Sequence, residues 1–337
     1  MGKRLGKQTI QFQTPPAIAG AYAAVGKKEG DGPLGNWFDM VYQDEFLGQD
    51  TWEKAESKLI EDTVAGALQT AGIQPSDVQY IFAGDLLNQC AGSSFGVKTF
   101  EIPFFGIFGA CSTMCEGLSL AAMAIDGGFA DCCVAATESH FCSAEKQFRF
   151  PLEYGGVRAP TSQWTVTGSG AAVLKASGSG PHITHITTGK IVDMGITDAN
   201  NMGAAMAPSA ADTLFQHFAD TGRSPDDYDY IVTGDLGRVG GSILIDLMKD
   251  KNYDLQNRYV DCGCMIFDEG TSDSKAGGSG CGCCGSVFCG YHYKRLQKGE
   301  LKRILVMATG ALMSPTTSQQ GTPILGIAHA VAVEGGN

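Results

Sequence analysis

The amino-acid sequence predicts a duplicated α/β protein in which two similar halves pack as layers of helix, sheet, helix, sheet and helix. Three observations lead to this prediction. One segment recurs later in the chain, a second pair of segments opens similar helices of small residues, and the expected strands are apolar with little polar alternation. Strands of that kind are typical of parallel sheets that helices cover on both faces.

The clearest repeat joins residues 75–86, which read PSDVQYIFAGDL, to residues 225–236, which read PDDYDYIVTGDL. Each copy follows a glycine, Gly72 or Gly222, at the expected end of a helix. Glycine after a helix and proline just beyond it are common stop signals. The first of these helices is expected to begin with a cap at Asp50-Thr51 and to run to about residue 71. Each copy then turns and enters a buried strand that ends in Gly-Asp-Leu.

A second repeat joins residues 109–117 (GACSTMCEG) to residues 278–285 (GSGCGCCG). Each segment opens a helix, and a strand ending in Ala-Thr follows, at 131–137 in the first half and at 303–309 in the second. We therefore predict one half at residues 1–177 and another at residues 178–337. The alternative is two separate α/β domains without a shared core.

Composition and charge exclude several classes of function. The chain has 337 residues, 43% of them hydrophobic, and a formal net charge of −12. This charge disfavours binding to nucleic acid, which needs a basic surface, and simple attachment to anionic lipid. No apolar run reaches the roughly 18–20 residues of a membrane-spanning helix, and no secretory signal is visible near the start. We expect a soluble protein made in the cytoplasm.

Twelve cysteines are many for a chain that is expected to stay in a reducing compartment. Reduced thiols are therefore expected, most of them small buried side chains. Two cysteine-rich segments, at 262–264 and 281–284, look like metal ligands. Their spacing does not match the usual zinc pattern, in which about two to four residues separate paired cysteines. The segment at 277–280 also lacks the ending of a phosphate-binding loop. We predict no metal site and no cofactor.

Cys111 is the sharpest chemical candidate in the sequence. It lies between an apolar strand and a helix of small residues, so its side chain is expected at the edge of the sheet and at a helix N-terminus. The helix dipole and free N–H groups there are expected to lower the pKa of the thiol. The same N–H groups suit an oxyanion or a ligand carboxylate. Because Ser112 is small, a ligand could approach its backbone closely.

The turn at residues 109–113 resembles the nucleophile turn of the thiolase and ketoacyl-synthase superfamily, and the duplicated halves and the glycine turn at 168–171 fit the same fold. The resemblance is closer to the stage V sporulation protein AD family and covers nearly the whole chain. The stretches that carry it are residues 28–35 (KEGDGPLG), 83–89 (AGDLLNQ), 149–156 (RFPLEYGG), 202–208 (MGAAMAP) and 308–316 (ATGALMSPT).

The resemblance implies a sporulation protein that binds dipicolinic acid, usually with calcium, for its uptake into the developing spore. It also implies a homodimer that acts at the spore inner membrane, beside membrane proteins encoded by the same operon. The implied ligand site includes Cys111, Asp85 and Asn88. The carboxylate of Asp85 would repel a dianion unless calcium bridges the two or Asp85 is protonated.

The sequence favours binding over condensation, because two catalytic groups of the superfamily are missing. A condensing enzyme needs His with His or Asn to polarise a thioester carbonyl and to stabilise the anion that forms. Asp235 stands where the ketoacyl synthases place a histidine, and the loop at 276–280 contains no asparagine. One alternative is an enzyme that transfers or hydrolyses acyl groups with Cys111 as nucleophile. Another is a scaffold whose pocket is vestigial.

His329 is the remaining candidate for the site. It lies in the last expected strand, a region that members of the superfamily bring near the nucleophile. It could donate to a ligand or pair with Cys111, and a histidine satisfied in the core is the alternative. His140 is a weaker candidate for the same role.

Overall fold

The computed structural model describes residues 3–148, 151–269 and 273–336. Each half of the chain contributes five main strands, and neighbouring strands pair in the same way in both halves. The first set is, in spatial order, β6 (Phe104–Gly106), β5 (Tyr80–Gly84), β7 (Cys132–Ser139), β9 (Gly168–Lys175) and β3 (Ala17–Val25). The second set is β12 (Tyr259–Asp261), β11 (Tyr230–Thr233), β14 (Arg303–Leu312), β15 (Leu325–Glu334) and β10 (His182–Thr187).

Strand direction repeats along with strand order, which confirms the duplication predicted from the sequence. In each set the first three strands are parallel, and the last two pairings are antiparallel. The two sets meet at one residue pair, His182 with Ala17, between β10 and β3. The recurring segments found in the sequence thus form β5 and β11 at equivalent places in the two sets.

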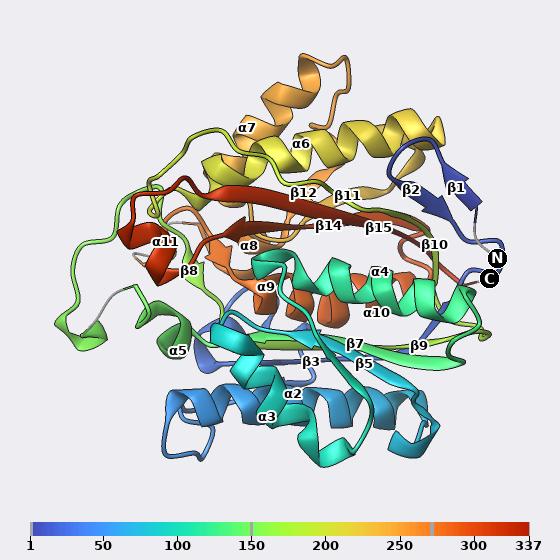
Figure 1. Ribbon diagram of the computed structural model, residues 1–337, viewed down its shortest axis with the longest axis horizontal. Helices are drawn as coiled ribbons and strands as arrows, with labels where there is room; N and C mark the ends of the chain where they lie inside the picture. Colours follow the sequence, from blue (N-terminus) through green and yellow to red (C-terminus); the bar gives the residue numbers. More distant parts are fainter. Residues whose placement is uncertain (1–2, 149–150, 270–272, 337) are drawn as a thin grey trace.

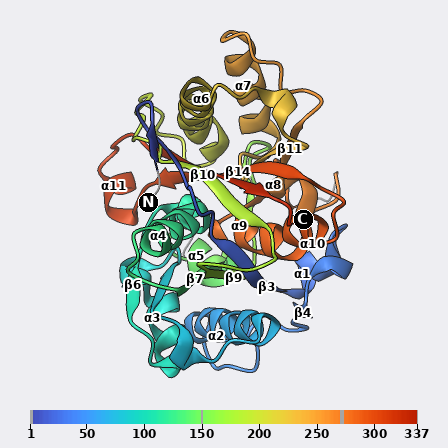
Figure 2. The same ribbon diagram turned by 90° about the vertical axis from the view of Figure 1, so that its right-hand side faces the viewer.

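Helices form three layers around the two sets of strands, as Figure 2 shows. One outer layer contains α2 (Trp52–Ala71) and α3 (Ala91–Val97), and the other contains α6 (Met202–Thr221) and α7 (Gly237–Lys249). Between the sheets lie α4 (Thr113–Asp126), α9 (Cys281–Val287) and α10 (Tyr293–Gln297) (Figure 1). The order of layers is the predicted helix, sheet, helix, sheet, helix.

The long outer helices begin and end where their sequences indicate. The hydroxyl of Thr51 accepts a hydrogen bond from the backbone N–H of Lys54 and caps α2. The amide of Asn201 caps α6 in the same way. Both helices end at a glycine with positive φ, Gly72 at 65° and Gly222 at 70°, a conformation that suits glycine because it lacks Cβ.

The largest apolar cluster of the protein lies in the central layer and draws side chains from both halves. Met114 and Leu118 of α4 meet Val306 of β14, while Cys284 and Phe288 of the second half pack toward the first sheet. Burial of apolar surface contributes roughly 25 cal/mol per Å². This shared core therefore stabilises the packing of the two halves together. Where the boundary between the halves falls stays a prediction.

Shorter elements complete the fold. Three short helices lie near the end of the sheets where the cysteine turn is found. They are α5 (Phe141–Glu145), α8 (Cys262–Ile266) and α11 (Pro315–Gln319). Besides several 3-10 turns and one π turn, the other elements are α1 (Lys27–Gly30), β1 (Lys3–Leu5), β2 (Thr9–Gln11), β4 (Met40–Val41), β8 (Trp164–Thr165) and β13 (Gly278–Ser279). None of the helices in the described ranges is both long and apolar enough to span a membrane. The family-like stretch at 149–156 begins outside the described residues.

Candidate functional site

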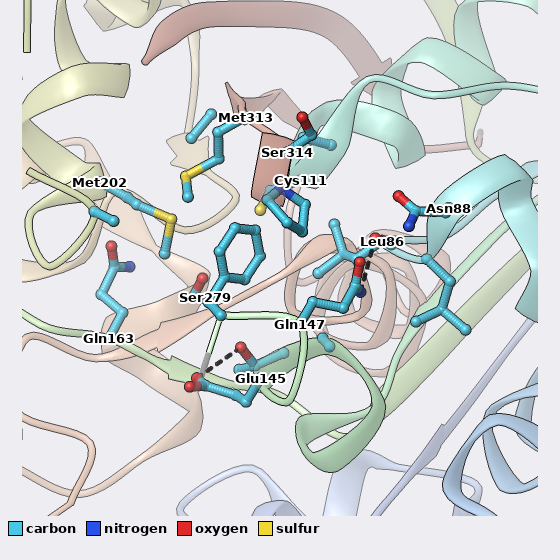
Figure 3. Close-up of a pocket in the computed structure, with 18 of the residues that line it drawn as sticks. Leu86, Asn88, Cys111, Glu145, Gln147, Gln163, Met202, Ser279, Met313 and Ser314 are labelled. Atoms are coloured by element: carbon cyan, nitrogen blue, oxygen red, sulfur yellow. Dashed lines mark hydrogen bonds between the residues drawn. The ribbon is translucent and has the colours of Figure 1, made fainter. Parts of the chain in front are cut away.

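A cavity of about 450 Å³ lies at one end of the sheets, where the cysteine turn is found. Loops from both halves meet there and form its wall. Its wall is mainly apolar, with leucine, phenylalanine, methionine and alanine side chains, and a few polar groups project into it. Figure 3 shows Cys111 and Asn88 from the first half and Met202 and Met313 from the second, with Asn88 and Met202 on opposite sides of the view. A mostly apolar cavity of several hundred Å³ with a few polar groups is typical of a small-molecule site.

The cysteine turn places Cys111 on the wall of this cavity, as the sequence predicts. Ala110, just before it, has a φ of 49°, in the left-handed region that residues other than glycine rarely adopt. The turn is held by the hydroxyls of Ser112 and Thr113, which donate to the backbone carbonyls of Gly109 and Ala110 at 2.7 Å each. Cys111 itself is 5% exposed, so its sulfur is reached only through the cavity.

Asp235, from the second half, lies directly against the thiol of Cys111. Its buried carboxylate accepts hydrogen bonds from the backbone N–H of Gly280 and the hydroxyl of Thr309, both at 2.9 Å, and from the thiol. Burial raises the pKa of Asp235 to about 7, although these hydrogen bonds oppose the shift. A buried carboxylate therefore lies beside the thiol and accepts a hydrogen bond from it.

The thiol is held in its protonated form, contrary to the pKa expected from the sequence. Burial, and after it the negative charge of Asp235, raises the pKa of Cys111 well above its ordinary value of 9. The sequence argument considered only the helix N-terminus, whose favourable effect is smaller than the loss of solvation. Because the pKa of Asp235 is far lower than that of the thiol, the proton stays on sulfur.

Asn88 also lines the cavity, on the loop that follows β5. Its neighbours Gln89 and Cys90 both have positive φ, at 58° and 51°, so the loop is tightly turned. Asp85 does not line the cavity. Its carboxylate instead accepts from the backbone N–H of Leu87 and from the backbone and hydroxyl of Ser93, each at 2.7 Å. Asp85 therefore holds the loop that presents Asn88.

Ser112 and His329 are not among the residues on the cavity wall. The hydroxyl of Ser112 is used within the turn, and the residue is fully buried. His329 lies on β15, where its Nδ1 accepts from the backbone N–H of Gly189 at 3.2 Å. Burial lowers the pKa of His329 to about 4, so its ring is neutral at physiological pH. The weaker candidate His140 caps α5 and contacts the backbone carbonyl of Glu45 through Nε2 at 2.7 Å.

Sequence reasoning missed several polar residues of the cavity, among them Glu145, Arg158 and Gln163. Gln163 donates from its amide to the backbone carbonyls of Asp235 and Gly278, at 2.7 and 2.9 Å. It thereby joins the first half to the loops around Cys111. The one available signal was a lone arginine in a stretch rich in glycine and proline, at residues 152–162.

The cysteine-rich segments lie in and beside the central layer. All twelve cysteines are free thiols, and the thiol of Cys281 donates to the backbone carbonyl of Glu138 at 2.8 Å. Within the described ranges, no three His, Cys, Asp or Glu side chains are grouped so that they could hold a metal ion. The small side chains of α9 let it pack closely on β9, where a Cβ on Gly170 would lie 2.0 Å from the carbonyl oxygen of Gly285.

Comparisons with known proteins agree with this geometry. Two condensing enzymes of known structure share the fold, namely 3-oxoacyl-(acyl-carrier-protein) synthase III from Aquifex aeolicus VF5 and a tetronic acid condensing enzyme. The first has a TM-score of 0.58 and 14% identity and covers 95% of this chain and 99% of that one. The second has a TM-score of 0.60 and 16% identity and covers 95% and 100%. Fold and cysteine turn together define a protein with the thiolase-like fold of these condensing enzymes.

The sequence comparisons identify the family within that superfamily. Residues 6–334 match the model of the stage V sporulation protein AD family. The chain is also 47% identical to stage V sporulation protein AD of Bacillus subtilis (strain 168) over 334 residues, which is 98% of each protein. The chain belongs to the stage V sporulation protein AD family, and it is therefore a sporulation protein with a thiolase-like fold.

Proposed function

We propose that this protein binds dipicolinic acid in the Cys111 cavity and serves the uptake of that ligand into the developing spore without catalysing a reaction. The observation that carries the proposal is the Cys111–Asp235 pair. A buried thiol with a raised pKa, hydrogen-bonded to a carboxylate, is a poor nucleophile, yet it faces a cavity of about 450 Å³. The site thus combines a binding cavity with an inert cysteine.

The cavity wall suits a flat aromatic acid. Leu86, Phe108 and Met202 offer apolar surface for a ring, and the amide of Asn88 offers a donor for a carboxylate. Glu145 is the one carboxylate among the described residues of the wall. Calcium takes about six to eight oxygen ligands, so a calcium ion that enters with dipicolinate would be held mainly by the ligand's own carboxylates and by water.

Condensation chemistry is less well supported by the site. Acyl transfer needs a thiolate and donors for the oxyanion, whereas Asp235 supplies a negative charge beside the sulfur. If incubation with acyl-coenzyme A leaves an acyl group on Cys111 in the mass spectrum of the protein, the enzymatic alternative gains over the binding function.

Titration calorimetry of the purified protein with dipicolinic acid, with and without calcium, tests the proposal. We expect saturable binding, and we expect Asn88→Ala to weaken it about fivefold, the effect of losing one hydrogen bond of about 1 kcal/mol. Asn257→Ala, at an exposed asparagine of the second half, is the matched control and should bind like the native protein. Absence of heat and of thermal stabilisation at millimolar ligand would contradict the proposal.

We further propose that the protein is a homodimer that pairs through the edge strand β6. Among the described residues this strand pairs only with β5, and unpaired edges invite pairing with another chain. Phe105 on this strand is 51% exposed, and the nearby Phe108 is both exposed and part of the cavity wall. A partner at this edge would therefore cover one side of the cavity mouth.

Phe105→Glu is expected to convert the dimer into a monomer, because it places a charge in the apolar interface. Size-exclusion chromatography with light scattering measures the mass directly. Phe215→Glu, on the outer helix α6, is the control and should leave the mass unchanged. A native protein that is already monomeric at micromolar concentration would overturn this assignment.

The proposed place of action is the periphery of the spore inner membrane, where membrane proteins encoded by the same operon would receive the ligand. The family relationship supports this proposal. Co-purification of those membrane proteins with the tagged protein from sporulating cells tests it, and a tagged protein that stays in the soluble fraction alone would count against it.

A further inference from the structure

Two charged side chains, Arg158 and Glu145, stand out on the wall of the cavity. They are its one cation and its one anion among the described residues. Glu145 ends the short helix α5, whereas Arg158 lies in the irregular segment before β8. Figure 3 shows Glu145 on the side of the cavity away from Cys111 and Met313.

The pair is buried and imperfectly satisfied. Nη1 of Arg158 lies 3.4 Å from Oε2 of Glu145, and Nη2 lies 3.2 Å from Oε1. The side chains are 10% and 8% exposed. Nη2 also donates to the backbone carbonyl of Gln163. The buried Nε of Arg158, however, has no hydrogen-bond partner among the described residues. An unpaired donor of a buried guanidinium is costly, so a ligand that supplies an acceptor for Nε would gain that hydrogen bond.

Aromatic side chains fix the orientation of the guanidinium. The rings of Phe141 and Trp164 stack with their centroids 3.9 Å apart. The guanidinium carbon of Arg158 lies 5.2 Å from the ring centre of Trp164 and 5.9 Å from that of Phe141. A stacked guanidinium presents its N–H donors in one plane, which matches the two oxygens of a carboxylate.

We propose that Arg158 is the residue that recognises one carboxylate of the ligand, and that Glu145 occupies its place while the cavity is empty. This inference rests on the proposed function and adds a second anchor to it. When the ligand enters, its carboxylate accepts from Nε and Nη2 and displaces Glu145 from Nη2. Glu145 keeps the hydrogen bond that its Oε1 accepts from the hydroxyl of Thr165 at 3.1 Å.

Two separated anchors explain why the ligand should be a dicarboxylate. One carboxylate binds Arg158, and the other lies toward Asn88 and the Cys111 turn, which Figure 3 shows apart from Glu145, the partner of Arg158. Picolinic acid, which carries one carboxylate on the same ring, can satisfy only one anchor. It should therefore bind more weakly than dipicolinic acid, and the difference should depend on Arg158.

Calorimetric titrations of Arg158→Gln and Glu145→Gln with dipicolinic and picolinic acid test the inference. Arg158→Gln is expected to weaken dipicolinate binding about tenfold, since it removes a charge-assisted pair of hydrogen bonds, and to remove the preference over picolinate. Glu145→Gln removes the competitor and is expected to tighten dipicolinate binding a few fold. The two variants break the same ion pair, so a pair with only a structural role would change affinity in the same direction in both.

The control breaks a comparable ion pair elsewhere. Arg223 contacts Glu334 at 3.0 Å, and the two side chains are 20% and 27% exposed. This pair lies at the end of the second sheet where β14 begins, far from the cavity. Arg223→Gln should bind both ligands like the native protein. Native-like dipicolinate affinity in Arg158→Gln, with binding still weakened by Asn88→Ala, would overturn the role of Arg158 and leave the proposed function standing. Failure of the native protein to bind dipicolinate would overturn both.

Discussion

Replacing Asp235 with asparagine is expected to make Cys111 a reactive thiol. The carboxylate accepts a hydrogen bond from the protonated thiol and places a negative charge beside the sulfur, and both effects disfavour a thiolate. With a neutral amide there, the pKa of the thiol should fall, so a larger share of Cys111 is ionised at pH 8 and its alkylation should be several-fold faster. The rate at which iodoacetamide alkylates the Cys111 peptide, followed by mass spectrometry across pH, measures this change.

The internal duplication supplies a matched control for that experiment. Asp85 occupies the place in the first repeat that Asp235 occupies in the second, but it contacts Leu87 and Ser93 instead of the thiol. Asp85→Asn should therefore leave the alkylation profile of Cys111 unchanged. If Asp235→Asn also leaves it unchanged, burial alone keeps the thiol inert and the argument from the Cys111–Asp235 pair fails.

Replacing Glu138 with glutamine is expected to stabilise the protein at pH 8 but not at pH 5. Ser93 brings Glu138 and Asp85 together, since its hydroxyl contacts Oε1 of Glu138 at 3.0 Å and Oδ2 of Asp85 at 2.7 Å. Glu56 is buried beside them and hydrogen-bonded by Ser143. Burial, and after it the charges of its neighbours, raises the pKa of Glu138 well above its ordinary value of 4.5.

The sign of this pH dependence follows from proton binding. Above pH 4.5 the unfolded chain releases the proton of Glu138, whereas the folded protein retains it until the pH reaches the raised pKa. The folded state binds more protons over that interval, so its stability falls as pH rises. Glutamine is neutral throughout. We expect a melting temperature about 3 °C higher at pH 8, corresponding to about 2 kcal/mol.

Calorimetric melting at the two pH values distinguishes this outcome from its opposite. Glu153→Gln, at an exposed glutamate, is the control and should change the melting temperature little at either pH. A loss of stability at pH 8 in Glu138→Gln would mean that the carboxylate is charged and well paired in the folded protein.

The layered fold could be predicted because the signals for it lie in short, continuous segments of the chain. Glycine and proline mark the ends of α2 and α6, and the apolar strands β5 and β11 carry nearly the same sequence. The position of Cys111 on a cavity followed from the same kind of evidence, since a strand, a turn and a helix are consecutive there. Each of these features depends on neighbouring residues.

The chemistry of the site depends on contacts that the sequence does not place. Asp235 reaches Cys111 only because the two halves pack around one central layer, so its effect on the pKa of the thiol could not be read from the turn. Arg158 meets Glu145 through an irregular segment that has no periodicity to interpret. His329 was expected near the nucleophile from the position of its strand, but its ring contacts Gly189 instead.

A crystal structure of the protein soaked with dipicolinic acid would test the central claim most directly. The account predicts a planar ring inside the Cys111 cavity, with one carboxylate on Arg158, the other toward Asn88, and an unmodified sulfur. Density for the ligand only on the outer surface, or an empty cavity at saturating concentration, would contradict it.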